Sequence, residues 1–376
     1  MKQEQLPAED DAVEVAPDVV RVQLPIMLPG LGHVNCYVLE DGRGITLIDP
    51  GLPGPDAHAE LERRLRRAGY PMSRVHTVLV THSHPDHFGG AGRIKVEQRC
   101  DVVAHEHFVT PFDGGDTAAD SGLLDGDLDE LIDVGSDSPA APTTLREVLF
   151  GEGDLPEIPP RTTPWGGEGF RPSEGELEHM RSWDRLSKEG LLSLDPTVRV
   201  HDEQIVVLGG EEWIVVHTPG HTGDHICLFD PLHGTLLSGD HVLPTITPHI
   251  SGMQHPSLPG DGSDSLAQFF DGLRRVAAID GVTTVLPAHG LPFDDLGGRV
   301  DAIIEHHLDR LQLLSGIADD LGEAEVGDYS RRLFRERSWG PMAESETYAH
   351  LEHLRRDGRV AARRDADGML RYRPVA

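Results

Sequence analysis

The sequence has few cysteines, an excess of acidic over basic residues and no long hydrophobic run. Its 376 residues include only Cys36, Cys100 and Cys227, widely spaced and odd in number, so neither a disulfide framework nor a thiolate zinc cluster is expected. Lys and Arg number 33 against 64 Asp and Glu, and the net charge of −31 opposes binding to nucleic acid or anionic membrane. No apolar stretch could cross a bilayer, and the acidic N-terminus lacks the apolar segment of a secretory signal, so a cytoplasmic protein is expected.

A chain of this length has room for one large domain and one small one. We expect a disordered acidic lead over residues 1–17, a large domain over 18–298 and a C-terminal module over 299–376. Predicted strands lie at 19–24, 34–39, 45–48, 75–80, 101–104, 226–229, 235–238 and 284–287, with helices at 56–70, from 89 onward and at 265–279. Three further strands at 198–200, 204–208 and 213–216 are expected to form a meander. This alternation favours helices covering a layered sheet.

The stretch Thr81-His82-Ser83-His84-Pro85-Asp86-His87 directly follows the predicted strand 75–80. Its order, H-x-H-x-D-H, places four imidazole or carboxylate ligands where Pro85 stops the strand from continuing. Such groups bind zinc, iron or manganese, and the first two histidines can reach one ion while the Asp-His pair reaches a second. A surface loop rich in histidine by chance is the alternative, because the chain holds 22 histidines, but the later ligands weigh against it.

Three later strands end in Gly or Pro turns that carry His221, Asp240 and His289. The predicted ligands fall into two sets: His82, His84 and His221 for one metal, Asp86, His87 and His289 for the other, and Asp240 as a bridge. The sets leave room for a shared water or hydroxide. Asp49 ends the strand 45–48, where it can cap the next loop or orient a ligating histidine, and spacing alone favours the cap.

Residues from about 110 to 196 interrupt the large domain with an Asp/Gly-rich part and a Pro-rich part that contains Trp165. A solvated surface excursion and a lid or wall of a substrate pocket fit this pattern equally well. His249 and His255 lie in a Pro-rich loop after Asp240 that could overhang the cleft. Either histidine could protonate a leaving group or bind a substrate carboxylate, and Trp165 could supply an apolar surface.

The C-terminal segment combines helices with a hairpin. A helix is expected over 299–314 and another over 347–356, followed by short strands at 359–363 and 369–373. Helix followed by hairpin resembles a winged-helix module. Its histidines, His306, His307, His350 and His353, are interpreted as surface or packing residues.

Taken in order, the motifs resemble those of metallo-β-lactamase superfamily hydrolases. The matching residues are Asp49-Pro50-Gly51, Thr81 to His87, Thr218-Pro219-Gly220-His221-Thr222, Ser238-Gly239-Asp240 and Pro287-Ala288-His289-Gly290. The resemblance implies a four-layer αββα sandwich of the α/β class, with the metals at one edge of two facing sheets. It also implies that Asp49 orients a ligating histidine instead of only capping a loop. The C-terminal segment resembles the winged-helix-like extension of some β-lactamase-like hydrolases. Two departures are Asp224, where a glycine is common, and the long span between His84 and His221.

A bridging aspartate such as Asp240 resembles the glyoxalase II-like, thioesterase and lactonase branches. We therefore expect a dinuclear hydrolase that cleaves a thioester, ester or lactone of a small acyl substrate by a metal-activated hydroxide oriented by Asp86. Two Zn²⁺ ions are expected, with Mn²⁺ or Fe as alternatives. A metal-dependent phosphodiesterase or nuclease, a mononuclear iron persulfide dioxygenase and a non-enzymatic scaffold are the rival interpretations. Membrane and nucleic-acid partners are not expected, and homo-oligomers stay open.

Overall fold

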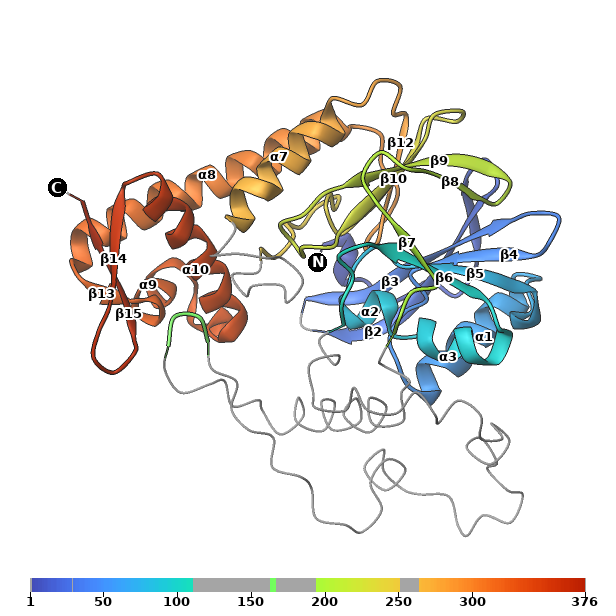
Figure 1. The fold of residues 1–376 in the computed structure, drawn as a ribbon, viewed down its shortest axis with the longest axis horizontal. Coiled ribbons are helices and arrows are strands. Elements are labelled where there is room, and N and C mark those ends of the chain that lie inside the picture. The colour runs from blue at the N-terminus through green and yellow to red at the C-terminus, as the bar shows by residue number, and fades with distance from the viewer. Residues whose placement is uncertain (1, 29, 111–162, 167–193, 251–263, 376) are drawn as a thin grey trace, which may run out of the picture.

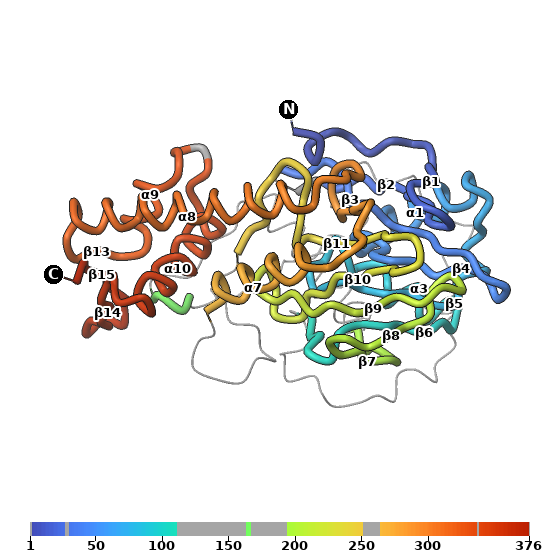
Figure 2. Tube along the Cα trace, turned by 90° about the horizontal axis from the view of Figure 1, so that it is seen from above, coloured from blue at the N-terminus to red at the C-terminus, as the bar shows by residue number. Residues whose placement is uncertain are grey.

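Two facing β-sheets form the centre of the protein in a computed structural model that describes residues 2–28, 30–110, 163–166, 194–250 and 264–375 (Figures 1 and 2). The strands of the first sheet are β1 (Val13–Ala16), β2 (Val19–Leu28), β3 (Leu31–Glu40), β4 (Ile45–Ile48), β5 (Val75–Leu79), β6 (Asp101–His105) and β7 (Val198–Val200), in that order across the sheet. Those of the second are β8 (Ile205–Leu208), β9 (Glu211–His217), β10 (Ile226–Asp230), β11 (Thr235–Gly239) and β12 (Thr284–Pro287), in the order β12-β11-β10-β9-β8.

Helices α1 (Pro55–Arg67) and α3 (Ala91–Gln98) cover the outer face of the first sheet, and α7 (Ser265–Ala277) and α8 (Leu296–Leu321) cover that of the second. The shorter helices are η1 (Gln3–Gln5), η2 (Met72–Arg74) and α2 (Pro85–Phe88). The C-terminal module adds β13 (Ala324–Glu325), α9 (Val326–Leu333), η4 (Glu336–Ser338), α10 (Pro341–Arg356), β14 (Val360–Arg364) and β15 (Leu370–Pro374), with the three strands in the order β13-β15-β14.

Three hydrophobic clusters fill the spaces between the four layers. Because side chains of a strand alternate between its faces, Leu47 of β4 joins the cluster beneath α1 and α3, whereas the next residue, Ile48, joins the cluster between the sheets. In β12, Leu286 lies in this central cluster and Val285 in the one beneath α7 and α8. The predicted αββα sandwich is confirmed.

The predicted meander over 198–216 is wrong for its first strand. β7 pairs in parallel with β6, with Val198 opposite Val103, whereas β8 pairs antiparallel with β9 in the other sheet. The chain therefore crosses between the sheets after Val200, whose side chain is buried in the central cluster. A short apolar strand does not specify its neighbour, because pairing depends on segments far along the chain.

The N-terminal segment is ordered, contrary to the predicted disordered lead. Glu4 is buried, and its carboxylate accepts hydrogen bonds from the backbone N–H of Thr245, at 2.6 Å, and from the hydroxyl of the same residue. Asp10 lies against Arg63 and Arg67 of α1. These acidic groups bind partners elsewhere in the fold instead of staying solvated, which acidic composition alone does not reveal. The domain boundaries themselves stay predictions, and α8 crosses the one at 298.

The C-terminal module is packed on the sandwich through a shared core. One hydrophobic cluster extends from the second sheet through Val276 of α7 and Ile303 of α8 to Leu354 and Tyr372 of the module. Figure 1 shows α8 running from the sandwich into the module. The predicted C-terminal helical module is confirmed, although α8 is longer than predicted. None of the helices in the described ranges is long and apolar enough to cross a membrane.

Two buried histidines are expected to make stability depend on pH. His307 of α8 and His350 of α10 are fully buried, and their Nδ1 and Nε2 atoms lie 3.0 Å apart. Burial lowers the pKa of His307 to about 2, aided by His350, and burial lowers the pKa of His350 to about 4 despite the nearby Glu346. In the unfolded chain each of these histidines takes up a proton near pH 6.5, whereas in the folded chain both stay neutral at that pH.

The free energy of unfolding should therefore be unaffected by these groups above pH 6.5 and fall as the pH drops from there toward 4. The expected slope is up to about 1.4 kcal/mol per pH unit for each histidine. Urea unfolding of chelator-treated protein at several pH values checks this. His307→Gln should flatten the slope, whereas His201→Gln, at an exposed histidine, should not. An unchanged slope in His307→Gln would contradict the assignment.

Candidate metal centre

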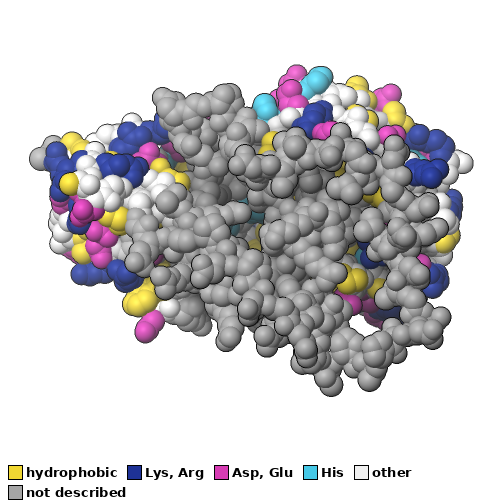
Figure 3. Space-filling view, turned by 60° about the horizontal axis from the view of Figure 1, so that its bottom comes forward, with side chains coloured by type: hydrophobic (Ala, Val, Ile, Leu, Met, Phe, Trp, Pro, Cys, Tyr) yellow, Lys and Arg dark blue, Asp and Glu magenta, His cyan; other side chains and the backbone are white. Residues whose placement is uncertain are grey.

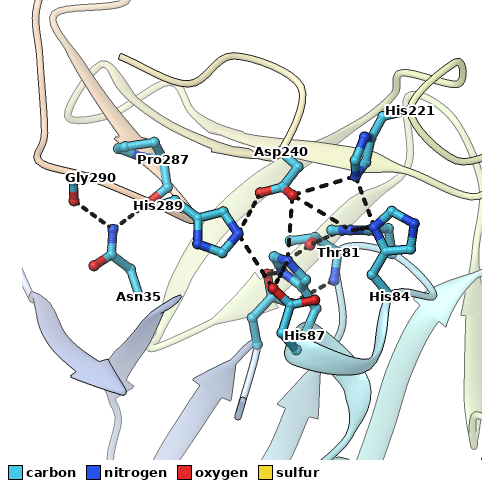
Figure 4. Close-up of polar contacts among 12 residues, drawn as sticks. Asn35, Thr81, His84, His87, His221, Asp240, Pro287, His289 and Gly290 are labelled. Atoms are coloured by element: carbon cyan, nitrogen blue, oxygen red, sulfur yellow. Dashed lines mark hydrogen bonds and ion pairs between the residues drawn. The ribbon is translucent and has the colours of Figure 1, made fainter. Parts of the chain in front are cut away.

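Seven potential ligand side chains meet at one end of the facing sheets (Figure 4). They come from the turn after β5 and from the segments that follow β9, β11 and β12. The first group is His82, His84, His221 and Asp240, and the second is Asp86, His87 and His289. The structure thus brings together the residues in the two sets that the sequence predicts.

The turn after β5 is shaped by its own residues. Pro85 occupies the first position of α2, where its missing N–H is not needed, so Asp86 and His87 lie on one helical turn. His84, just before it, has extended backbone. Ser83, between the two ligating histidines, instead donates a hydrogen bond to Asp224 at 3.0 Å. The residue that departs from the superfamily pattern therefore supports the ligand turn.

The segment after β11 requires a glycine. Gly239 has a φ of 51°, and a Cβ atom there would lie 2.5 Å from Nε2 of His225. That same nitrogen accepts a hydrogen bond from the backbone N–H of Asp240 at 3.0 Å. Glycine thus lets His225 approach closely enough to hold the backbone of Asp240.

The candidate ligand atoms of the first group lie close together. Nδ1 of His84 lies 3.1 Å from Nε2 of His82 and 2.9 Å from Nε2 of His221. Oδ2 of Asp240 is 3.4 Å from Nε2 of His221 and 4.0 Å from Nε2 of His82. Ligand atoms on a tetrahedral zinc ion with bonds of about 2.0–2.1 Å are about 3.4 Å apart. The spacing fits one ion.

The candidate ligand atoms of the second group are also close together. Oδ2 of Asp86 lies 3.5 Å from Nε2 of both His87 and His289. Asp240 also faces this group, 3.6 Å from Nε2 of His87 through Oδ2 and 3.3 Å from Nε2 of His289 through Oδ1. Nε2 of both histidines and Oδ1 of Asp240 are buried without a hydrogen bond of acceptable geometry. An unsatisfied buried group costs about 1–3 kcal/mol, so these converging atoms fit a second divalent ion.

Hydrogen bonds on the outer ring nitrogens hold four of the histidines in orientation. The donor and acceptor pairs are His82 Nδ1 to Thr81 Oγ1 at 3.1 Å, His87 Nδ1 to Asp49 Oδ2 at 2.9 Å, His221 Nδ1 to the carbonyl of His249 at 2.6 Å, and His289 Nδ1 to the carbonyl of His33 at 2.6 Å. Each bond leaves the opposite Nε2 free to bind a metal.

Asp49 supports both ligand groups. Its carboxylate accepts hydrogen bonds from the N–H and the hydroxyl of Thr81, at 2.8 and 2.7 Å, as well as from His87. Through Thr81 it also reaches His82. The position behind ligating histidines that the resemblance implies agrees with these contacts, and the bond to the Thr81 N–H also holds the start of the ligand turn.

The protonation of the two groups differs in the metal-free protein. Burial lowers the pKa of His82 well below its ordinary value, with further lowering by His87. Burial opposes the charged form of His87 too, but Asp86 and Asp240 raise its pKa well above the ordinary value. Asp240 likewise raises the pKa of His289 against the effect of burial. An ion entering the second group therefore displaces protons from its histidines.

Asn35 of β3 contributes to the site, although it lies outside the ligand motifs. Its side-chain Nδ2 donates to the carbonyls of Pro287 and Gly290, at 2.7 and 2.9 Å, on both sides of His289 (Figure 4). In the sequence, Asn35 stands out only as an amide within the apolar run Val34-Asn35-Cys36, and in the structure it is buried. Such an amide needs hydrogen-bond partners, but the sequence does not name them.

The predicted substrate contacts have different surroundings. Trp165 is buried, and its ring centroid lies 5.2 Å from that of Tyr348 of α10, so it packs against the C-terminal module. His249 lies at the metal centre through its carbonyl group. His255 and most of the segment 110–196 lie outside the described residues. Substrate binding by Trp165, His249 and His255 stays a prediction.

Comparisons with known proteins agree with this geometry. A family model described as Metallo-beta-lactamase superfamily matches residues 29–289. Probable metallo-hydrolase YqjP of Bacillus subtilis is 26% identical over 294 residues, 78% of this chain and 76% of that protein. Beta-lactamase-like protein 2 homolog of Drosophila melanogaster is 23% identical over 347 residues, 90% of this chain and 87% of that protein.

Solved structures show the same fold over nearly the whole chain. A metallo-beta-lactamase family protein from Thermus thermophilus superposes with a TM-score of 0.65 and 24% identity, covering 96% of this chain and 99% of that one. A beta-lactamase domain protein from Burkholderia ambifaria gives a TM-score of 0.66 and 24% identity, covering 98% and 96%. Since the family model matches residues 29–289, a range that includes every candidate ligand from His82 to His289, the chain belongs to the metallo-β-lactamase superfamily and is a metal-dependent hydrolase.

Proposed function

We propose that this protein hydrolyses the thioester, ester or lactone bond of a small acyl substrate with two divalent metal ions, zinc in first place. The observation that carries the proposal is the position of Asp240, whose carboxylate lies 3.3–3.6 Å from histidines of both ligand groups. One carboxylate can thereby serve two neighbouring ions. Such ions, when bound, lower the pKa of water from about 16 to about 7 and polarise a carbonyl group.

Side chains of the protein would position the attacking water and the substrate. Asp86 of α2 belongs to the second ligand group, where it lies 3.5 Å from both histidines, and is the residue we propose to orient the attacking water. His249, at the edge of the first group, would contact the substrate. A cysteine nucleophile is disfavoured, because burial raises the pKa of Cys100 to about 11 and of Cys227 to about 12.

The rival functions have weaker support. Retention of Asp86, His87 and His289 favours two ions over the single iron of a persulfide dioxygenase. For the C-terminal module we propose a winged-helix-like fold, supported by its helices and the strand order β13-β15-β14. Its surface mixes basic and acidic side chains (Figure 3), and Arg363 pairs with Glu323. This pairing disfavours binding of a nucleic-acid backbone.

Metal content and substrate class should be measured on protein purified without added metal. We expect two zinc ions per chain and turnover of thioesters, aryl esters or lactones in a panel that also contains bis-aryl phosphodiesters. A chelator should abolish turnover, because the bound ions activate the water, and added Zn²⁺ should restore it. One iron per chain with oxygen uptake would favour the dioxygenase, and turnover of phosphodiesters alone would favour the nuclease.

A further inference from the structure

The loop from Asp240 to His249 touches the metal centre at both ends. Asp240 faces both ligand groups. At the other end, the carbonyl oxygen of His249 accepts a hydrogen bond of 2.6 Å from Nδ1 of His221. This bond directs Nε2 of His221 toward His84 and the first ion. The placement of the loop therefore determines the orientation of a ligand.

Groups from outside the ligand motifs hold the middle of this loop. Arg299 of α8 donates hydrogen bonds to the carbonyls of Leu243 and Ile246. Lys2 donates to the carbonyl of Thr245 at 2.9 Å. These bonds fix the backbone up to residue 246. None of these three bonds reaches His249, whose carbonyl contacts His221.

Glu346 of α10 contacts the side chain of His249. Its Oε2 lies 3.4 Å from Nδ1 of His249, and its Oε1 accepts a hydrogen bond of 2.7 Å from Arg310 of α8. Arg310 in turn donates to Nε2 of His306 at 2.9 Å. Although burial favours the neutral acid, the contacts with His249 and Arg310 hold the pKa of Glu346 far below its usual range. A charged carboxylate thus joins the C-terminal module to the loop.

A third metal site is the competing interpretation of this region. Glu346, His307 and His350 are close enough to share an ion. However, His307 and His350 are hydrogen-bonded to each other at 3.0 Å, and the two oxygens of Glu346 face Arg310 and His249. An added cation would have to displace the guanidinium group from the carboxylate. The contacts favour a role for Glu346 toward His249.

We propose that Glu346 is a positioning residue of the metal centre, which holds His249 so that its carbonyl keeps His221 oriented toward the first metal ion. The inference rests on the metal centre of the proposed function and not on its substrate. It gives the C-terminal module a part in the hydrolytic site. The module would then tune metal affinity from a helix that supplies no ligand.

Zinc affinity tests this role directly. In Glu346→Ala, we expect the first ion to bind about 10-fold more weakly and the second ion to bind as in wild type. A loss of about 10-fold is at the lower end of the affinity losses seen when a group that orients a metal ligand is removed. Competition with a chromogenic chelator measures both constants, and the absorption bands of the cobalt-substituted protein report changes at the first site. Glu344→Gln, a charge loss on the same helix two residues away, should leave both ions unchanged.

A second variant separates positioning from misfolding. His249→Ala keeps the backbone carbonyl but removes the side chain that meets Glu346, so it should weaken the first ion to a similar extent. The double variant should be no weaker than the singles, because both changes break one link. Circular dichroism and urea unfolding verify that each variant is folded.

Three results would overturn the inference while leaving the proposed function intact. They are wild-type zinc binding in a folded Glu346→Ala protein, additive losses in the double variant, and a third zinc ion that disappears in Glu346→Gln. Failure of the wild-type protein to bind divalent metal would instead overturn the proposed function.

Discussion

Asp240→Ala is expected to lose both metal ions and to lower hydrolytic activity by about 1000-fold or more, equivalent to at least about 4 kcal/mol of transition-state stabilisation. The reason is geometric. Asp240 reaches His221 of the first group and both His87 and His289 of the second at 3.3–3.6 Å. Without its carboxylate, each group loses a negatively charged ligand. Three histidine nitrogens alone would then hold the first ion, and one aspartate with two histidines would hold the second.

His84→Ala gives the matched comparison. His84 contacts His82 and His221, so its loss should release the first ion and reduce activity similarly, while the second group keeps its ligands. Metal content after gel filtration and kcat/KM on the same samples distinguish the two variants. His201→Ala, at an exposed histidine, should match wild type. Full metal content with full turnover in either ligand variant would contradict the assignment of the site.

Asp49→Ala should combine a loss of stability with a loss of metal. The buried carboxylate accepts three hydrogen bonds of 2.7–2.9 Å from Thr81 and His87. Its removal leaves buried donors without a partner, which should lower the free energy of unfolding by about 3–5 kcal/mol. Without the bond that orients His87, the second ion should bind about 10–100-fold more weakly.

Urea unfolding of metal-free protein and zinc titration measure these two effects separately. Asp49→Asn keeps the volume but replaces one acceptor oxygen with an amide donor, so it should be less destabilised and still bind the second ion weakly. Asp56→Ala, at an exposed carboxylate of α1, serves as the control. A folded Asp49→Ala protein with wild-type affinity for two zinc ions would show that His87 does not depend on Asp49.

The side chains that meet at the candidate metal centre could be predicted from the sequence because each lies in a short motif at the end of an apolar run. The turn Thr81 to His87 holds four of them within a few residues, and His221, Asp240 and His289 follow later strands in the same way. The layers of the sandwich were predictable for a related reason. Alternating side chains within a strand encode which faces are buried, and this information is local.

Contacts between distant segments could not be predicted from such local patterns. The pairing of β7 with β6 depends on a strand nearly a hundred positions earlier, and Glu4 is ordered by the backbone of Thr245. Asn35 holds a turn near residue 289 for the same kind of reason. In each case the sequence shows a short strand or a polar residue, and its partner depends on how the complete chain packs.

The superfamily pattern, the seven candidate ligands and the succession of strands along the chain follow from the sequence alone, because these depend on residue type and on spacing over a few positions. The packing of the complete chain was needed to show that the carbonyl of His249 orients His221 and that Glu346 contacts this loop. Glu346 and His249 are 97 positions apart. Their contact depends on packing α8 and α10 against the sandwich, which no local pattern specifies.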